Sequence, residues 1–475
     1  MTRHRAEHVL REESALADAT ASSVDPIEAA VVLESAGMND RVARDLFGAH
    51  DVLMLAERVM THEGPDRPVA DPVPVRPENA GGAARRTTFW FHLRGVLYAV
   101  PALVTLTLLP AVDPVESALV LGGLVLSWAW SYGVAGIAWA HLGNQDPAGA
   151  RRFLRRALIG GVLLAAVVAT AVVYAALIVT STLQVDLLTV LLLTGQSTYL
   201  LAAATLLMTG HELLLLVAVC PAVAALGLGL TGRMPADALR WVGAGVLLAV
   251  LFALAATRRA ARPRQRLGAA AWATALQQSC YGLLVAVAVL FPAINELVND
   301  NYDALPLSVT LAALPLVVSM GIAEILLTRF RSRMSALLAT TSSSAAFARS
   351  ARRTLLRYEV AFAVPLAATS AALGVVVEGV TGTLDARYGL LAGGYVVLGT
   401  AIFTAMLLNL LGRGRRVLAT LAATVAALVA FEVHAVSVTA TDTEALAWLA
   451  IVATVTLVVH LVLVRRYVAV PVSHR

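Results

Sequence analysis

Residues 116–141, ESALVLGGLVLSWAWSYGVAGIAWAH, decide which class of protein this chain belongs to. The stretch carries one formal charge, on its first residue, and consists otherwise mainly of aliphatic, aromatic and small side chains. A helix of about 20 predominantly apolar residues crosses the hydrocarbon core of a bilayer. The stretch therefore predicts a transmembrane α-helix.

Similar apolar runs continue along most of the chain. Of the 475 residues, 59% are hydrophobic and 14% are charged, whereas a soluble domain is about 45–50% apolar and about 25% charged. This composition excludes an ordinary soluble enzyme, a secreted disulfide scaffold and a disordered regulator. We predict an all-α, polytopic membrane protein. Its twelve predicted transmembrane helices are residues 94–112, 116–141, 157–182, 187–209, 212–231, 239–257, 269–293, 306–327, 358–379, 388–411, 417–437 and 444–464.

The distribution of arginine supports this count of spans. Arginine supplies all 36 basic residues other than histidine, and with Ala, Val, Leu and Gly it suggests a GC-rich bacterial genome. With the N-terminus inside, the inner segments hold 25 arginines and the outer loops hold three. Positive residues accumulate on the cytoplasmic side of membrane proteins. We therefore expect a multi-pass protein of the bacterial inner membrane with both termini in the cytoplasm.

Residues 1–60 predict a small cytoplasmic module of three short helices. Residues 25–28, DPIE, form a favourable helix start, and Gly37 and Gly48 end the first two helices. The pattern resembles ubiquitin-associated-like modules, which suggests a cytoplasmic protein partner; the alternative is a partly ordered tail. A Pro- and Gly-rich linker, residues 61–86, separates it from the spans. The side chains expected to point inward are Ile27, Val31, Val42, Leu46, Phe47, Leu53 and Leu55.

Two arginine-rich stretches occupy equivalent positions in two halves of the membrane region. Residues 150–156, ARRFLRR, enter the third span, and residues 351–357, ARRTLLR, enter the ninth. Each predicts an amphipathic helix held at the inner surface by anionic lipids. The chain is therefore interpreted as two six-helix lobes, residues 87–257 and 258–475, an architecture found in many transporters.

The loop after the second span carries a family resemblance. Residues 143–152, GNQDPAGARR, resemble the Gly-x-x-Asp…Ala-Arg-Arg loop of the multidrug/oligosaccharidyl-lipid/polysaccharide (MOP) flippase superfamily, and the inner segment 329–357 resembles a loop of its C-terminal lobe. Motif A of major-facilitator transporters fits less well, because Asp146 lies one position early. The resemblance implies two lobes around a cavity that opens alternately to each side. Its polysaccharide branch implies a lipid-linked sugar as cargo.

The superfamily's drug/cation antiporter branch often uses an acidic residue inside its first span. The apolar part of the first span here, from Gly95 to Val112, contains none. This departure argues against cation-coupled drug export, although other acids within the membrane could substitute.

Charged side chains within the spans are candidate site residues, because they are costly in a bilayer and tend to face a wet cavity or the protein interior. Glu432 and His434 in the eleventh span are the clearest pair and point to different sides of a helix. Glu432 is a candidate cation or proton site or a hydrogen-bond partner for a sugar; alternatively, both residues lie near the outer interface. Glu324 is close in sequence to Arg329, which favours a structural ion pair.

Other side chains are suited to a sugar and its phosphate groups. Amides both donate and accept hydrogen bonds, aromatic rings stack on sugars, and arginines bind pyrophosphate through charge-assisted bonds. The structural alternatives are hydrogen bonds between helices, packing against lipid and snorkelling to lipid phosphates. The candidates are Gln196, Gln277, Gln278 and Asn409, the aromatic pair Trp128 and Tyr132, and the cations Arg94, Arg352, Arg353 and Arg357.

The sequence contains no enzyme signature: it has no P-loop, no HExxH and no nucleophile elbow. We expect no catalysis, no cofactor, no metal site and no nucleic-acid partner. The favoured function is a transporter that flips a lipid-linked saccharide or related amphiphile outward, in contact with membrane lipids. The alternatives are a major-facilitator-like or drug/cation exporter of small molecules, and a membrane scaffold that does not transport.

Overall fold

The computed structural model describes residues 26–35, 40–62, 114–180, 187–230, 238–258, 267–298, 307–341, 343–381, 386–438 and 442–470, with residues 16, 20, 23, 38, 93–95, 97, 100 and 104. The chain divides into two compact units, Met1–Ala83 and Ala84–Arg475. The described secondary structure of both units is helical.

The first unit contains three short helices, α2 (Pro26–Ser35), α3 (Asp40–Phe47) and α4 (Val52–His62). Proline stands at the first position of α2, and Gly48 ends α3 with a φ of 65°, a conformation that glycine adopts without strain. The Asp51 carboxylate accepts a hydrogen bond of 2.8 Å from the Met54 N–H and so caps α4. This bond and the neighbouring His50 ring lower the pKa of Asp51. The predicted helix start and the break at Gly48 are confirmed.

The core of this module differs from the prediction. Phe47 and Leu55 are buried as predicted, and Val42 is partly buried, but Ile27, Val31 and Leu53 are exposed. The side chain of Leu46 lies outside the described residues. The buried face combines alanines, whose small side chains let the helices pack closely, with Leu33, and Ile27 and Val31 of α2 point outward. The buried residues are Ala29, Ala30, Leu33, Ala43, Phe47, Ala49, Val52, Leu55, Ala56 and Val59.

The second unit contains a helix for each of the last eleven predicted spans. Its first predicted span, residues 94–112, lies mostly outside the described residues. Within the described part of the chain, nine helices are long and apolar enough to cross a membrane, and α9 and α10 contain shorter apolar segments. The helices are α6 (Pro114–Gly143), α7 (Pro147–Thr180), α8 (Leu187–Met208), α9 (Glu212–Leu230), α10 (Ala238–Ala256), α11 (Ala269–Val298), α12 (Leu307–Thr340), α13 (Ser344–Thr381), α14 (Ala386–Leu410), α15 (Gly414–Val438) and α16 (Asp442–Val468).

Three of these helices extend further than the sequence predicts. The arginines of 150–156 and 351–357 form the early turns of α7 and α13, rather than separate helices on the membrane surface. The predicted inner segment 328–357 is mostly helical, because α12 continues to Thr340 and α13 begins at Ser344. Amphipathic turns continue an apolar helix without a break when no glycine or proline interrupts them.

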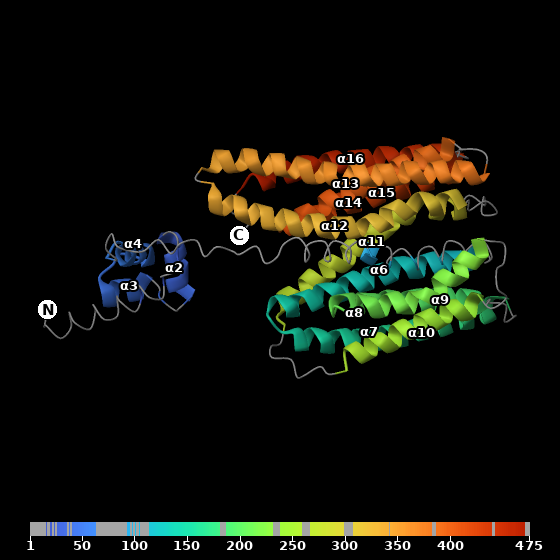
Figure 1. The fold of residues 1–475 in the computed structure, drawn as a ribbon, viewed down its shortest axis with the longest axis horizontal. Helices are drawn as coiled ribbons and strands as arrows, with labels where there is room; N and C mark the ends of the chain where they lie inside the picture. The colour runs from blue at the N-terminus through green and yellow to red at the C-terminus, as the bar shows by residue number, and fades with distance from the viewer. Residues whose placement is uncertain are drawn as a thin grey trace. The chain divides into compact units, whose positions relative to one another are not determined.

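The helices of the second unit pack in two groups around two apolar clusters, and α11 contributes residues to both clusters. Helices α6–α10 form the N-terminal lobe, and α11–α16 form the C-terminal lobe. The two lobes meet mainly where α6 packs against α11 (Figure 1). The ends of the helices that carry the arginine-rich segments will be called the arginine-rich side.

Candidate functional site

The seam between α6 and α11 is tightly packed around glycines. An ideal Cβ placed on Gly133 would lie 2.1 Å from the Ser279 hydroxyl, and one on Gly136 would lie 3.3 Å from the Ala275 Cα. Pairing of residue 133 with 279 and of 136 with 275 makes the two helices antiparallel. A side chain at position 133 would require the Ser279 hydroxyl to rotate, and one at position 136 would require a small shift of α11, so both glycines favour this close approach.

Both predicted aromatic residues lie at this seam. Trp128 packs against the apolar cores of both lobes. The ring of Tyr132 lies 5.6 Å from that of Tyr281, centroid to centroid, and covers Gly282. Their surroundings are therefore contacts between lobes, rather than the lipid-facing surface of α6.

Arg94 connects the two lobes by hydrogen bonds to two carboxylates. Its Nη1 donates to Glu324 of α12 at 2.6 Å, and its Nη2 donates to Glu212 at the start of α9 at 2.5 Å. The Glu212 side chain is 15% exposed and the Glu324 side chain 41% exposed. Arg94 therefore forms ion pairs within the protein and does not extend to lipid phosphates. Glu324 pairs with Arg94, whereas the sequence suggested Arg329 as its partner.

Gly95 explains how Arg94 reaches the other lobe. An ideal Cβ on Gly95 would lie 2.3 Å from the Val318 carbonyl oxygen and 3.1 Å from the Gly321 nitrogen, both backbone atoms of α12. The first predicted span therefore approaches α12 backbone to backbone. The ion cluster of Arg94, Glu212 and Glu324 lies beside this contact.

The substitution Gly95→Ala is expected to separate residues 94–95 from α12, because the backbone of α12 cannot rotate away as a side chain can. Overpacking costs roughly 1–3 kcal/mol, so the midpoint of thermal unfolding should fall. Gly122→Ala is the matched control, since nothing lies within 4 Å of its ideal Cβ. The measurement is thermal unfolding of both purified variants, and equal midpoints would contradict the close approach.

Glu432 lies on the buried stripe of α15. It follows Leu428 by four positions and precedes Ala435 by three, and both of these residues are buried. Both carboxylate oxygens of Glu432 are buried and have no hydrogen-bond partner among the described residues. The side chain of His434 is exposed, so the two residues do point to different sides of the helix. A carboxylate in this position can bind a proton or another small cation.

The four predicted amides lie in three different places. Gln277 and Asn409 both pack against Gly414, at the arginine-rich end of the C-terminal lobe. Gln278 packs against Gly136 at the seam. The fourth, Gln196, lines a pocket inside the N-terminal lobe. The amides therefore do not line one continuous path in the described structure.

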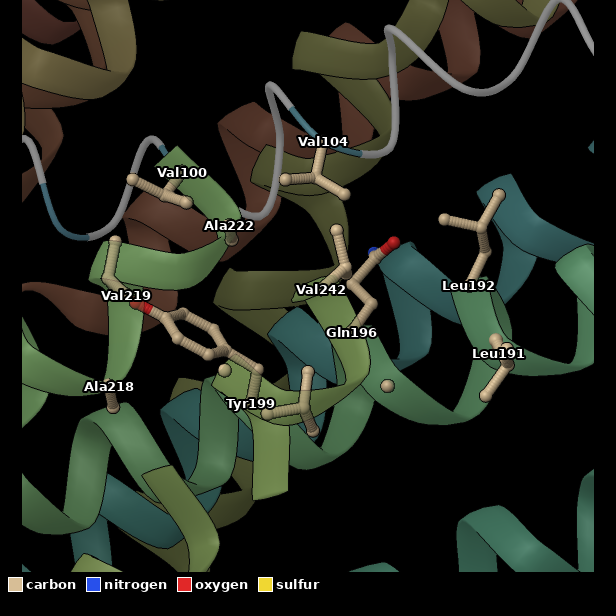
Figure 2. Close-up of a pocket in the computed structure, with 13 residues that line it drawn as sticks. Val100, Val104, Leu191, Leu192, Gln196, Tyr199, Ala218, Val219, Ala222 and Val242 are labelled. Atoms are coloured by element: carbon tan, nitrogen blue, oxygen red, sulfur yellow. The ribbon is translucent and has the colours of Figure 1, made fainter. Parts of the chain in front are cut away.

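The pocket around Gln196 is almost entirely apolar (Figure 2). It has a volume of about 40 Å³ and lies between α8, α9, α10 and residues 100 and 104. Tyr199 lines it and donates a hydrogen bond of 3.0 Å to the Leu97 carbonyl. The lining is aliphatic and the volume is far below the roughly 300–1,000 Å³ of a ligand pocket, so this pocket does not indicate a site for a sugar.

The predicted arginines of the C-terminal lobe lie apart from these features. Arg352, Arg353 and Arg357 are exposed on α13. Ala351, Leu355 and other residues on the opposite side of the helix are buried in the lobe. The described contacts do not include these arginines in the Arg94 ion cluster.

Sequence reasoning missed several buried acids. Glu359 is buried in α13 and interacts electrostatically with Arg465. Glu116, the first residue of the predicted span 116–141, is buried in the first turn of α6 and accepts a 2.6 Å hydrogen bond from Thr189. Glu296, which follows the predicted span 269–293, is buried near the end of α11. These three acids and Glu212 each lie at the edge of an apolar run, and this position could have identified them as candidate buried acids.

Comparison with known proteins gives structural likeness without sequence relatives. No protein-family model matches the chain, and no curated protein matches it. An outward-facing multidrug resistance MATE family transporter of the MOP superfamily is similar over 80% of this chain and 96% of its own, with 13% identity and a TM-score of 0.48. An inward-facing multidrug resistance MATE family transporter of the MOP superfamily is similar over 80% of this chain and 94% of its own, with 14% identity and a TM-score of 0.41.

A third solved structure, of MATE in complex with Br-NRF, is similar over 81% of this chain and 97% of its own. Its identity is 14% and its TM-score is 0.41. The likeness to these three structures concerns the arrangement of helices alone.

Proposed function

We propose that this chain is a transporter of the bacterial inner membrane that flips a lipid-linked saccharide or related amphiphile outward. The observation that carries the proposal is the ion cluster in which Arg94 binds carboxylates of both lobes. Alternating access needs contacts between lobes that close one side and can be broken. The bond between Arg94 and Glu324 is a polar contact of this kind, and it adds to the packed seam between α6 and α11.

The chemistry of Arg94 suits a pyrophosphate headgroup. A guanidinium presents several donors in a planar fork that matches phosphate oxygens, as it matches carboxylates. Glu324 is the more exposed of the two acids, so it is the partner that an entering phosphate would displace. Arg94 would then remain bound to Glu212 within its own lobe while its contact to the other lobe is broken.

Transport can be tested directly in proteoliposomes that contain the full chain. The probe is a fluorescent polyprenyl-pyrophosphate saccharide, and a membrane-impermeant reductant reports how fast it reaches the outer leaflet. We expect faster loss of protected fluorescence than in empty vesicles, and no acceleration for a fluorescent phosphatidylcholine. Equal rates with and without protein would reject the proposed cargo.

A second function, cation-coupled export of a small molecule, is favoured by Glu432. Its buried oxygens, which have no partner among the described residues, are suited to a proton-coupled or cation-coupled site. Efflux of a fluorescent drug driven by an imposed proton or sodium gradient would support this alternative. The absence of both activities from a folded, reconstituted protein would favour a scaffold that recruits partners through residues 1–60.

The topology is a separate prediction, with both termini in the cytoplasm. Cys220 and Cys280 are free and exposed, so they are first replaced by serine. Single cysteines are then introduced as Asp300→Cys and Ser473→Cys. A membrane-impermeant thiol reagent added to intact cells should label position 300 and leave position 473 unlabelled until the cells are opened. Labelling of position 473 from outside would contradict the prediction.

A further inference from the structure

The start of α15 and the end of α16 form a cluster of arginines around one aromatic ring. The guanidinium carbon of Arg413 lies 4.2 Å from the centroid of the Tyr467 ring, and that of Arg416 lies 4.9 Å from it. Tyr467 itself is buried. Arg465 and Arg466, in the last turn of α16, precede it directly. Two helices thus hold several positive charges at one place on the arginine-rich side.

These charges lack nearby acids in sequence. The chain contains no acidic residue between Arg387 and Glu432, and none after Glu444. Glu359 of α13 interacts with Arg465, but Arg413 and Arg416 face the same ring although their like charges repel. The Nε of Arg413 is buried and has no hydrogen-bond partner among the described residues. A cation–π contact holds each guanidinium in place but neutralises neither.

The surroundings of the cluster supply further donors. Gln277 and Asn409 pack against Gly414, the residue that follows Arg413. The cluster also surrounds the first turn of α15, where the helix dipole already favours an anion and disfavours arginine. Arginines at this end are repelled by the positive end of the helix dipole, and a bound oxyanion would offset this repulsion.

The adjoining surface of α16 indicates a lipid as the source of the anion. Val455, Val458 and Val462 are exposed and follow one side of α16 towards Arg466. Their spacing of three and four residues makes one stripe along the helix. An acyl chain can lie along this stripe while its phosphate lies among the arginines, an arrangement that a free phosphate ion would not use.

We propose that Arg413, Arg416 and Tyr467 form a binding site for the phosphate of an anionic phospholipid in the leaflet on the arginine-rich side. The guanidinium groups donate to the phosphate oxygens, and the Tyr467 ring keeps both groups oriented. The site goes beyond the proposed transport function, because the lipid is a resident of the C-terminal lobe and not the cargo.

Native mass spectrometry of the full chain in neutral detergent tests the site. The added probes are phosphatidylglycerol, phosphatidylcholine with the same acyl chains, and glycerol 3-phosphate. We expect the wild-type protein to retain phosphatidylglycerol in preference to the other two. The double variant Arg413→Gln/Arg416→Gln should lower its apparent affinity at least tenfold. The matched control Arg331→Gln/Arg333→Gln removes the same charge from exposed positions of α12 and should change affinity less than twofold.

Substitutions of Tyr467 test the role of the ring. Tyr467→Phe keeps the ring and should bind phosphatidylglycerol within twofold of the wild type, whereas Tyr467→Leu should bind it several-fold more weakly. Thermal unfolding without added lipid verifies that each variant is folded. If the double variant is unfolded, Arg416→Gln alone is used, with an expected loss of about threefold.

Three results would overturn the proposal. Equal retention of phosphatidylglycerol and phosphatidylcholine would show that the cluster does not select an anion. An equal loss in the α12 control would show a general effect of basic charge. Binding of glycerol 3-phosphate as tight as that of the lipid, with the same dependence on Arg413 and Arg416, would show a site for a soluble phosphate.

Discussion

Replacing Arg94 with glutamine is expected to destabilise the protein by about 2–3 kcal/mol and to reduce transport at least tenfold. The substitution leaves Glu212 and Glu324 facing each other without their shared cation, and unpaired charges of this kind are costly. The loss should be smaller than for a fully buried pair, because Glu324 is partly exposed. Chemical denaturation and the proteoliposome assay measure the two effects.

The double variant Arg94→Gln/Glu324→Gln separates the two roles of Arg94. Removing Glu324 together with Arg94 ends the repulsion between the two acids but leaves Glu212 without Arg94, so part of the lost stability should return. If Arg94 also binds the cargo headgroup, transport should remain low in the double variant. Recovery of transport would mean that Arg94 serves only to join the lobes. Arg331→Gln, at an exposed position of α12, is the control and should leave both readouts unchanged.

Replacing Glu432 with glutamine is expected to raise the thermal unfolding midpoint and to abolish cation-coupled export. Glutamine has nearly the same shape but no charge, so the cost of burying a carboxylate without a partner disappears. Efflux under an imposed gradient should fall at least tenfold if Glu432 binds the coupling cation. His434→Gln is the matched control, since that side chain is exposed two residues further along the same helix.

The outcome for Glu432 also distinguishes the two transport functions. Wild-type rates of gradient-driven efflux in Glu432→Gln would contradict a coupling role. If pyrophosphate-lipid flipping depends on Arg94 and not on Glu432, the flippase function is supported. If the reverse dependence is found, the small-molecule exporter is supported.

Helix positions could be predicted because they depend on local properties of the sequence. Apolar length and arginine placement are each evident within about 30 residues, and eleven of the predicted spans coincide with described helices. The short turn between the predicted spans 187–209 and 212–231 contains no arginine and is still a real break, because Gly210 adopts a φ of 75° there and α9 starts at Glu212.

The contacts of the candidate site could not be predicted in the same way. Arg94 binds Glu212 and Glu324, which are 118 and 230 positions away in sequence, and helical periodicity contains no information about partners on other helices. The same limit applies to α2, where side-chain size suggested that Ile27 and Val31 are buried although alanines form the packed face. Glu432 was identified because an acid well inside an apolar run is conspicuous regardless of its neighbours.

The length of α12 and α13 has a mechanical consequence. At 1.5 Å per residue, 34 and 38 residues make helices of about 50 and 57 Å, well beyond the roughly 30 Å of hydrocarbon in a bilayer. The excess is a paired, stiff rod that carries Arg331, Arg333, Arg352 and Arg353 and projects on the arginine-rich side. A rod of this kind acts as a lever. When the C-terminal lobe tilts by a few degrees, the residues at the end of this rod, Thr341 and Ser343, move farther than the rest of the lobe. A probe attached there would therefore detect the tilt most sensitively.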